Sequence, residues 1–136
     1  MRVFIDTNVT IDLLMKRQPH FTDCQAVMDR CDARKFDLFI AWHGLATAYY
    51  IVGNAVGDVL AAVAVREFLN LAAVATTGDA EARQAFTLGF KDLEDAMQAV
   101  AAEACNADVI VTRNKTDFAG SPVPAFTPAE FLARFP

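Results

Sequence analysis

Short, continuously apolar runs alternate along the chain with longer segments in which apolar residues recur every three or four positions. The runs Val3–Ile5, Leu38–Ala41 and Val109–Val111 are typical of strands that are buried on both faces of a sheet. A weaker strand is predicted at Leu71–Ala75, and a last short one at Ala125–Phe126. The pattern therefore predicts about five strands.

The segments between these strands have the apolar spacing of helices that bury one face. The predicted helices are Asn8–Leu14, Phe21–Cys31, Leu45–Val52, Val59–Leu69, Ala80–Leu88, Lys91–Cys105 and Ala129–Phe135. Gly53, Asn54 and Gly57 are interpreted as the break between the third and fourth helices. The residues expected to form the buried stripe of the sixth helix are Leu93, Met97, Val100 and Ala104.

Buried strands that alternate with helices indicate an α/β fold, in which helices cover both faces of an open parallel sheet in three layers. The length of 136 residues fits one domain over residues 1–136. Hydrophobic residues make up 54% of the chain and charged residues 21%, which excludes a disordered or collagen-like protein.

Charge and cysteine content further restrict the classes of protein that fit the sequence. The net charge is −5, from 12 basic and 17 acidic residues, which argues against a broad basic face for duplex nucleic acid. The cysteines Cys24, Cys31 and Cys105 are odd in number and form no C-x-x-C motif, so buried thiols in a reducing cytoplasm are expected. The uncharged stretch Leu38–Gly57 is long enough to span a membrane, but its glycines and His43 predict that it does not.

Acidic residues stand where an open parallel sheet binds its ligands, at the carboxyl ends of the strands. Asp6 follows the first predicted strand, Asp117 follows Val109–Val111, and Asp92 and Asp95 open the helix that leads into that strand. We expect these carboxylates to meet in one crevice. Their mutual repulsion would be relieved by Mg²⁺ or Mn²⁺, which prefer oxygen ligands and support phosphodiester hydrolysis.

Simpler interpretations of the same residues remain open. Asp92 and Asp95 fit an N-cap and a first-turn acid, which stabilise a helix start by about 1 kcal/mol. Asp117 fits a turn cap. Arg113 and Lys115 are candidates for contacting a substrate phosphate, or are residues of a solvated loop.

The order and spacing of four segments resemble the PIN-domain ribonucleases, over nearly the whole chain. The segments are Val3-Phe4-Ile5-Asp6-Thr7-Asn8-Val9, Asp92-Leu93-Glu94-Asp95-Ala96, Ile110-Val111-Thr112-Arg113-Asn114-Lys115-Thr116-Asp117-Phe118 and Thr127-Pro128-Ala129-Glu130-Phe131. The resemblance implies a five-stranded parallel sheet of order 3-2-1-4-5 and an endonuclease that cleaves RNA with Mg²⁺ or Mn²⁺. Many small single-domain members of the family are VapC-type toxins, often homodimeric and inhibited by an antitoxin protein.

The resemblance also implies roles for individual residues. The catalytic metal ligands would be Asp6, Asp95 and Asp117, with Asp92 as an auxiliary acid. Supporting roles would fall to Asn8, which braces the turn after the first strand, and to Thr112 and Asn114, which orient the later loop.

One position departs from the family pattern. The family usually carries a Glu early in the helix after the second strand, and Thr47 occupies that position here. A hydroxyl is a poor replacement for an anionic ligand, so a catalytically impaired PIN-like binding module is an alternative. A second alternative is a haloacid-dehalogenase-like phosphatase with Asp6 as nucleophile, although Asn8 stands where that chemistry needs a second Asp.

Overall fold

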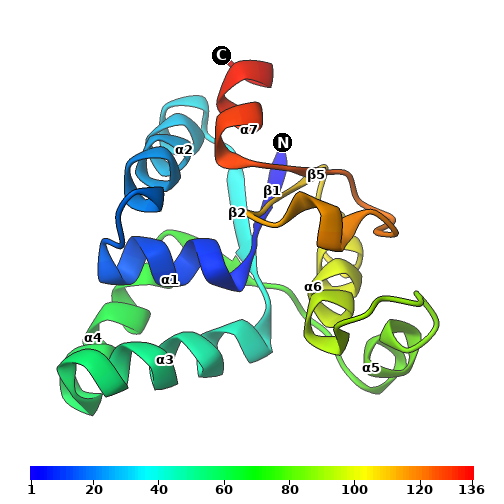
Figure 1. The fold of residues 1–136 in the computed structure, drawn as a ribbon, viewed down its shortest axis with the longest axis horizontal. Helices are drawn as coiled ribbons and strands as arrows, with labels where there is room; N and C mark the ends of the chain where they lie inside the picture. The colour runs from blue at the N-terminus through cyan, green and yellow to red at the C-terminus, as the bar shows by residue number, and fades with distance from the viewer.

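A computed structural model describes residues 1–136, in which five parallel strands form one sheet with helices on both sides (Figure 1). The strand order is β3-β2-β1-β4-β5, as the resemblance implied. The elements in chain order are β1 (Arg2–Ile5), α1 (Thr7–Met15), α2 (His20–Arg34), β2 (Asp37–Ile40), α3 (Trp42–Val56), α4 (Asp58–Phe68), β3 (Ala72–Val74), α5 (Asp79–Ala85), α6 (Leu93–Ala104), β4 (Val109–Val111), the 3₁₀ helix η1 (Lys115–Phe118), β5 (Ala125–Phe126) and α7 (Pro128–Arg134).

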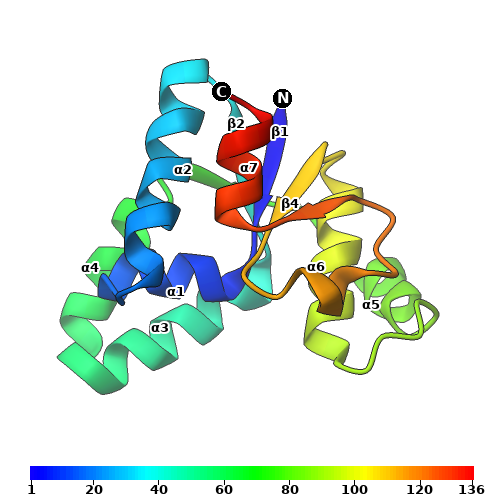
Figure 2. The same ribbon diagram turned by 45° about the horizontal axis from the view of Figure 1, so that its top comes forward.

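The central strand β1 lies between β2 and β4, and its register brings two sequence-distant strand ends together. Ile5 is paired with Val111, and the Asp6 amide donates to the Val111 carbonyl at 3.0 Å. The residues that follow β1 and β4 therefore lie side by side at the carboxyl edge of the sheet (Figure 2).

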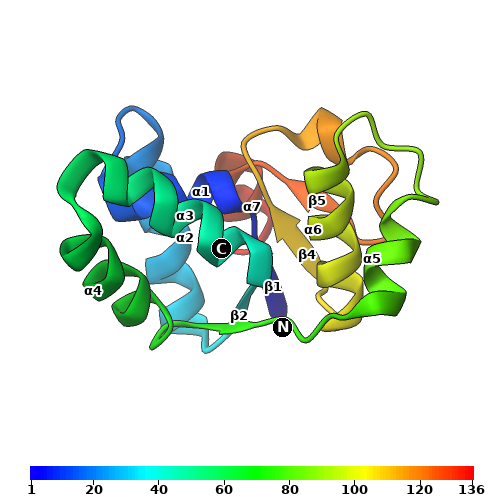
Figure 3. The ribbon, with the colours of Figure 1, turned by 90° about the horizontal axis from the view of Figure 1, so that it is seen from below.

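Both faces of the sheet are buried, which explains why its strands are continuously apolar. Val3 and Ile5 pack into a core with α2 and α7, whereas Phe4 and Ile110 face the opposite core against α6. Figure 3 shows the two outer layers, with α1–α4 on one side and α5 and α6 on the other.

The third predicted helix continues further than the sequence indicated. Gly53 and Asn54 were expected to break it, but α3 runs through both to Val56 and ends at Gly57, which has φ 91°. A Cβ at Gly53 would lie 3.0 Å from Asp58 Oδ1, so this glycine permits the close approach of α4 instead of ending a helix. The stretch Leu38–Gly57 is thus divided between β2 and α3, and no helix is long and apolar enough to cross a membrane.

The buried face of α6 differs from the predicted stripe. Leu93 is 42% exposed and Ala104 is also exposed, while Met97 is half-buried and only Val100 is buried as expected. The buried residues are Ala96, Gln98, Ala99, Val100, Ala101 and Ala102. Small alanine side chains let α6 lie close to the sheet, so the large apolar residues that usually mark a core face mislead here.

A close crossing of α3 and α1 generates a prediction for stability. A Cβ at Gly44 would lie 2.6 Å from the Thr7 hydroxyl, so Gly44→Ala is expected to lower the free energy of unfolding by about 1–3 kcal/mol through overpacking. Urea unfolding measures this change. The same substitution in a Thr7→Ala background should be less harmful, and an equal loss in both backgrounds would contradict the steric explanation.

Candidate functional site

Asp6 is the buried centre of the polar residues at the carboxyl edge of the sheet. It is the N-cap of α1, where its Oδ1 accepts from the Asn8 amide at 3.4 Å, and it is 1% exposed. Asn8 thus braces the turn after β1 through its backbone. The Asp6 side chain faces away from solvent and depends on protein groups for its hydrogen bonds.

Gln98 on α6 supplies one of these bonds. Its Nε2 donates to Asp6 Oδ1 at 2.7 Å and to Glu94 Oε1 at 3.2 Å, and its Oε1 accepts from the Thr7 amide and hydroxyl. The side chain is fully buried. Gln98 therefore ties the end of β1 to α6 and orients two carboxylates through one amide group.

Thr112 supplies the second bond, from the end of β4. Its hydroxyl donates to Asp6 Oδ2 at 2.7 Å and accepts from the Asn114 amide at 3.1 Å. The loop after β4 is thereby fastened to the end of β1. Thr112 takes part through its side chain and Asn114 through its backbone amide.

A cavity of about 460 Å³ lies beside this buried centre, and Asp92, Asp95 and Asp117 line it. Asp92 caps α6 by accepting from the amides of Glu94 and Asp95, as the simpler interpretation of this residue predicts. Carboxylate oxygens of Asp92, Glu94 and Asp95 lie within 4.8 Å of one another. A donor set made only of oxygens at this spacing fits Mg²⁺ or Mn²⁺.

The carboxylates are close enough to change one another's ionisation. Burial, together with the charges of Asp92, Asp6, Glu94 and Asp117 in decreasing order of effect, raises the pKa of Asp95 to about 7. The pKa of Asp6 is also raised, chiefly by burial, while its bonds to Thr112 and Gln98 act in the opposite direction. Segments from the beginning, late middle and end of the chain thus form one electrostatic unit.

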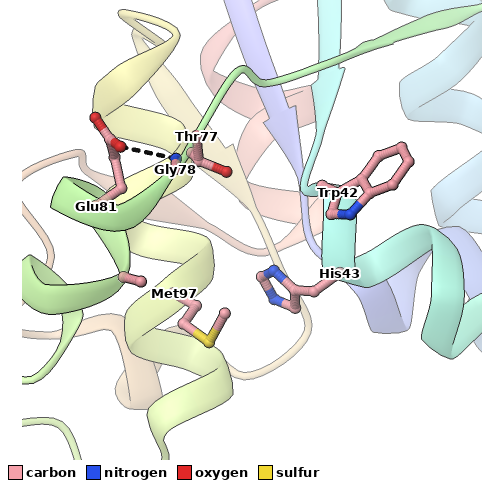
Figure 4. A pocket seen from close by; sticks show the side chains of 7 residues that line it. Trp42, His43, Thr77, Gly78, Glu81 and Met97 are labelled. Carbon is pink, nitrogen blue, oxygen red and sulfur yellow. Dashed lines mark hydrogen bonds between the residues drawn. The ribbon is translucent and has the colours of Figure 1, made fainter.

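Thr47, at the position of the expected family Glu, lies on α3 one turn beyond His43 and contributes no charge to this unit. The Thr47 hydroxyl donates to the His43 carbonyl of its own helix at 3.2 Å. His43, one turn earlier on α3, instead places Nε2 3.6 Å from Glu94 Oε1. It also lines a second cavity of about 200 Å³ with Trp42, Thr77, Gly78, Glu81, Ala82 and Met97 (Figure 4).

The two basic residues proposed as phosphate contacts are both paired with carboxylates. Arg113 Nε lies 2.9 Å from Oδ2 of Asp12, a fully buried residue of α1 whose Oδ1 also accepts from Arg17 at 3.0 Å. Lys115 Nζ lies 3.0 Å from Glu130 Oε1 on α7. These pairs fasten the loop after β4 to two helices.

Sequence reasoning missed Glu94, Gln98 and Asp12 as parts of this arrangement. Glu94 and Gln98 are four residues apart, and Gln98 follows Asp95 by one helical turn. That spacing was a usable signal, because it places an amide on the same helix face as two carboxylates. No local signal identified Asp12, because its partner Arg113 lies far away in the sequence, in the loop after β4.

Comparisons with known proteins agree with this fold. A family model described as PIN domain matches residues 2–116. Ribonuclease VapC1 from Aquifex aeolicus (strain VF5) is 30% identical over 140 residues, covering 98% of this chain and 95% of that protein. The structure of VapBC-1 from nontypeable Haemophilus influenzae matches with a TM-score of 0.73 and 16% identity, over 95% of this chain and 99% of that one. A toxin–antitoxin complex from Klebsiella pneumoniae matches with a TM-score of 0.71 and 22% identity, over 93% and 97%.

The raised pKa of Asp95 predicts how stability changes with pH in the metal-free protein. Between the usual carboxyl pKa of 3.8 and about 7, the folded chain holds a proton that the unfolded chain has released. Stability therefore falls as pH rises through this range, and the loss is complete above pH 7. In EDTA, the melting temperature of Asp95→Asn should exceed that of the wild type by about 5 °C at pH 8 and by less at pH 5.

The control for this experiment is Asp37→Asn, which removes an exposed carboxylate at the opposite end of the sheet. Its melting temperature should follow that of the wild type at every pH. A difference between wild type and Asp95→Asn that stays constant from pH 5 to pH 8 would contradict the assignment.

Proposed function

This chain belongs to the PIN-domain family and is of VapC type, and we propose on that basis that it is a metal-dependent endoribonuclease that hydrolyses RNA phosphodiester bonds. The observation that carries the proposal is that Asp117, after β4, and Asp95 of α6 line one cavity, with Asp6 close enough for its charge to act on Asp95. The effect of the other two charges on the pKa of Asp95 supports it. Ribonuclease VapC1, with 30% identity over 98% of the chain, supports the same activity.

Each residue has a distinct part in the proposed site. Asp95 and Asp117 would hold Mg²⁺ or Mn²⁺ from the wall of the cavity, with Asp92 as an auxiliary acid and Asp6 beneath them. When bound, such an ion polarises water and neutralises charge on phosphate oxygens. Because the pKa of Asp95 is about 7, a cation that binds here would displace the proton that Asp95 holds below that pH.

The residues around Asp6 would act by keeping it fixed. Gln98 and Thr112 each donate to a different oxygen of its carboxylate, and Asn114 fastens Thr112 in turn. A carboxylate held in this way needs little reorganisation energy when charge develops nearby. Asn8 supports the same turn from its backbone, whereas Thr47 adds no charge to the site.

The geometry does not favour the phosphatase alternative. An aspartate nucleophile needs an open face for attack on phosphorus, but Asp6 is 1% exposed and both its oxygens accept hydrogen bonds. The impaired binding module differs from the nuclease only in activity. Cleavage assays separate these two.

We also propose that the chain is the toxin of a toxin–antitoxin pair in the cytoplasm, binding an antitoxin and a second copy of itself. Large apolar side chains gather on the outer surfaces of α3 and α4, where Trp42 is 71% exposed, Tyr50 69% and Val59 79%. A patch of this kind is typical of protein–protein interfaces. The buried, unpaired cysteines Cys24, Cys31 and Cys105 agree with a reducing compartment.

RNA cleavage in Mn²⁺, with and without EDTA, tests the nuclease. Asp6→Asn and Asp95→Asn should each lower the cleavage rate at least about 100-fold while the melting curve remains cooperative, because each removes a negative charge from the metal centre. Asp37→Asn, at the opposite end of the sheet, is the matched control. Full cleavage by Asp6→Asn, or unchanged cleavage in EDTA, would exclude the proposed mechanism.

Restoring an acid at residue 47 gives a second test. Thr47 lies one turn beyond His43 on the helix face that contacts Glu94, so Thr47→Glu adds a carboxylate facing the acidic unit. Calorimetry should show Mn²⁺ affinity raised about tenfold, with faster RNA cleavage. Ala46→Glu makes the same charge change on an exposed neighbouring face and should leave the affinity unchanged. Equal affinities in both variants would show that position 47 does not reach the metal.

A further inference from the structure

The main cavity contains a single basic residue among its acidic ones. Its lining residues are Leu88, Gly89, Phe90, Lys91, Asp92, Asp95, Thr116, Asp117, Ala119 and Gly120. Lys91 is exposed and takes part in none of the ion pairs of the molecule. An RNA chain entering here meets three carboxylates and one ammonium group.

The other basic residues near this edge, Arg113 and Lys115, are each already paired with a carboxylate and are therefore less free to bind a phosphate. Arg113 is engaged by the fully buried carboxylate of Asp12, and withdrawing it would leave that charge with a single partner. Lys115 is paired with Glu130 and is directed toward α7, within 6.0 Å of the Phe126 ring. Neither residue lines the cavity.

The backbone that carries Lys91 is held against the loop that carries Asp117. The Phe90 ring packs edge-on against the buried Phe118, with ring centroids 6.2 Å apart. Gly120 allows this contact, because a Cβ there would lie 3.2 Å from Phe90 Cε1. The two walls of the cavity are therefore packed together, and the position of Lys91 relative to Asp117 is set by apolar contacts.

From this arrangement we propose that Lys91 binds a phosphate of the RNA backbone at the mouth of the acidic cavity. The inference rests on the proposed ribonuclease function and adds the residue that attracts the substrate. An ammonium group on a flexible four-carbon stem suits a phosphate whose position along the strand varies. It also offsets the repulsion between a polyanion and the carboxylates beside it.

Fluorescence anisotropy with a 5′-labelled 12-nucleotide oligouridylate tests the proposal, in Ca²⁺ to limit cleavage. Lys91→Gln should weaken binding about fivefold at low salt and reduce the slope of log K against log salt by about 0.7, the value for one phosphate contact on a single strand. Lys91→Arg should restore both. Lys35→Gln, at the opposite end of the sheet, makes the same charge change and should bind like the wild type.

A second measurement distinguishes attraction of substrate from a merely structural role. Removing the ammonium from beside the acidic residues should raise Mn²⁺ affinity about twofold in calorimetry while RNA binding falls, and a structural defect would lower both. Unchanged RNA affinity in Lys91→Gln, or an equal loss in Lys35→Gln, would overturn the assignment. If the wild type neither binds nor cleaves RNA, the ribonuclease proposal itself fails, whereas normal cleavage with an unaffected Lys91→Gln removes only the role of Lys91.

Discussion

The carboxylate of Asp6 is buried without an opposite charge in direct contact, and the local structure is arranged to make that tolerable. Isolated buried charge is strongly unfavourable unless hydrogen bonds replace the lost water. Here the replacements come from Gln98 on α6 and Thr112 after β4. Three elements that are remote in sequence must therefore be assembled before the Asp6 carboxylate, at the end of β1, has its hydrogen bonds. The same bonds that make burial possible also fix the position of the innermost acid of the site.

Like charges dominate the layer above this centre. Asp92 serves both as the cap of α6 and as a neighbour that raises the pKa of Asp95. One residue thus stabilises a helix start and destabilises an adjacent carboxylate. The like charges gathered beside this cap therefore lower the stability of the folded chain, as is common where binding sites retain unfavourable electrostatics.

The sequence predicted the parts of this molecule that depend on short-range pattern. β1 and β4 were evident from their apolar runs, and the position of Asp6 followed from the general rule for parallel sheets. The role of Gln98 was not predicted, because a glutamine among alanines is distinguished only by what lies 92 residues away. Gly53 misled for a related reason, since its close contact with Asp58 depends on how α3 and α4 pack. Pairings such as Arg113 with Asp12 require the tertiary structure, because nothing in either segment specifies the other.

Asp12 connects the turn after α1 with the loop after β4. Its two oxygens are divided between Arg17, in the turn after α1, and Arg113, in the loop that leads to Asp117. The turn and the loop therefore share one counter-ion. Displacing either arginine would leave the other as the only neutralising partner of an anion with no access to solvent, so the positions of the turn and the loop are coupled through a single side chain.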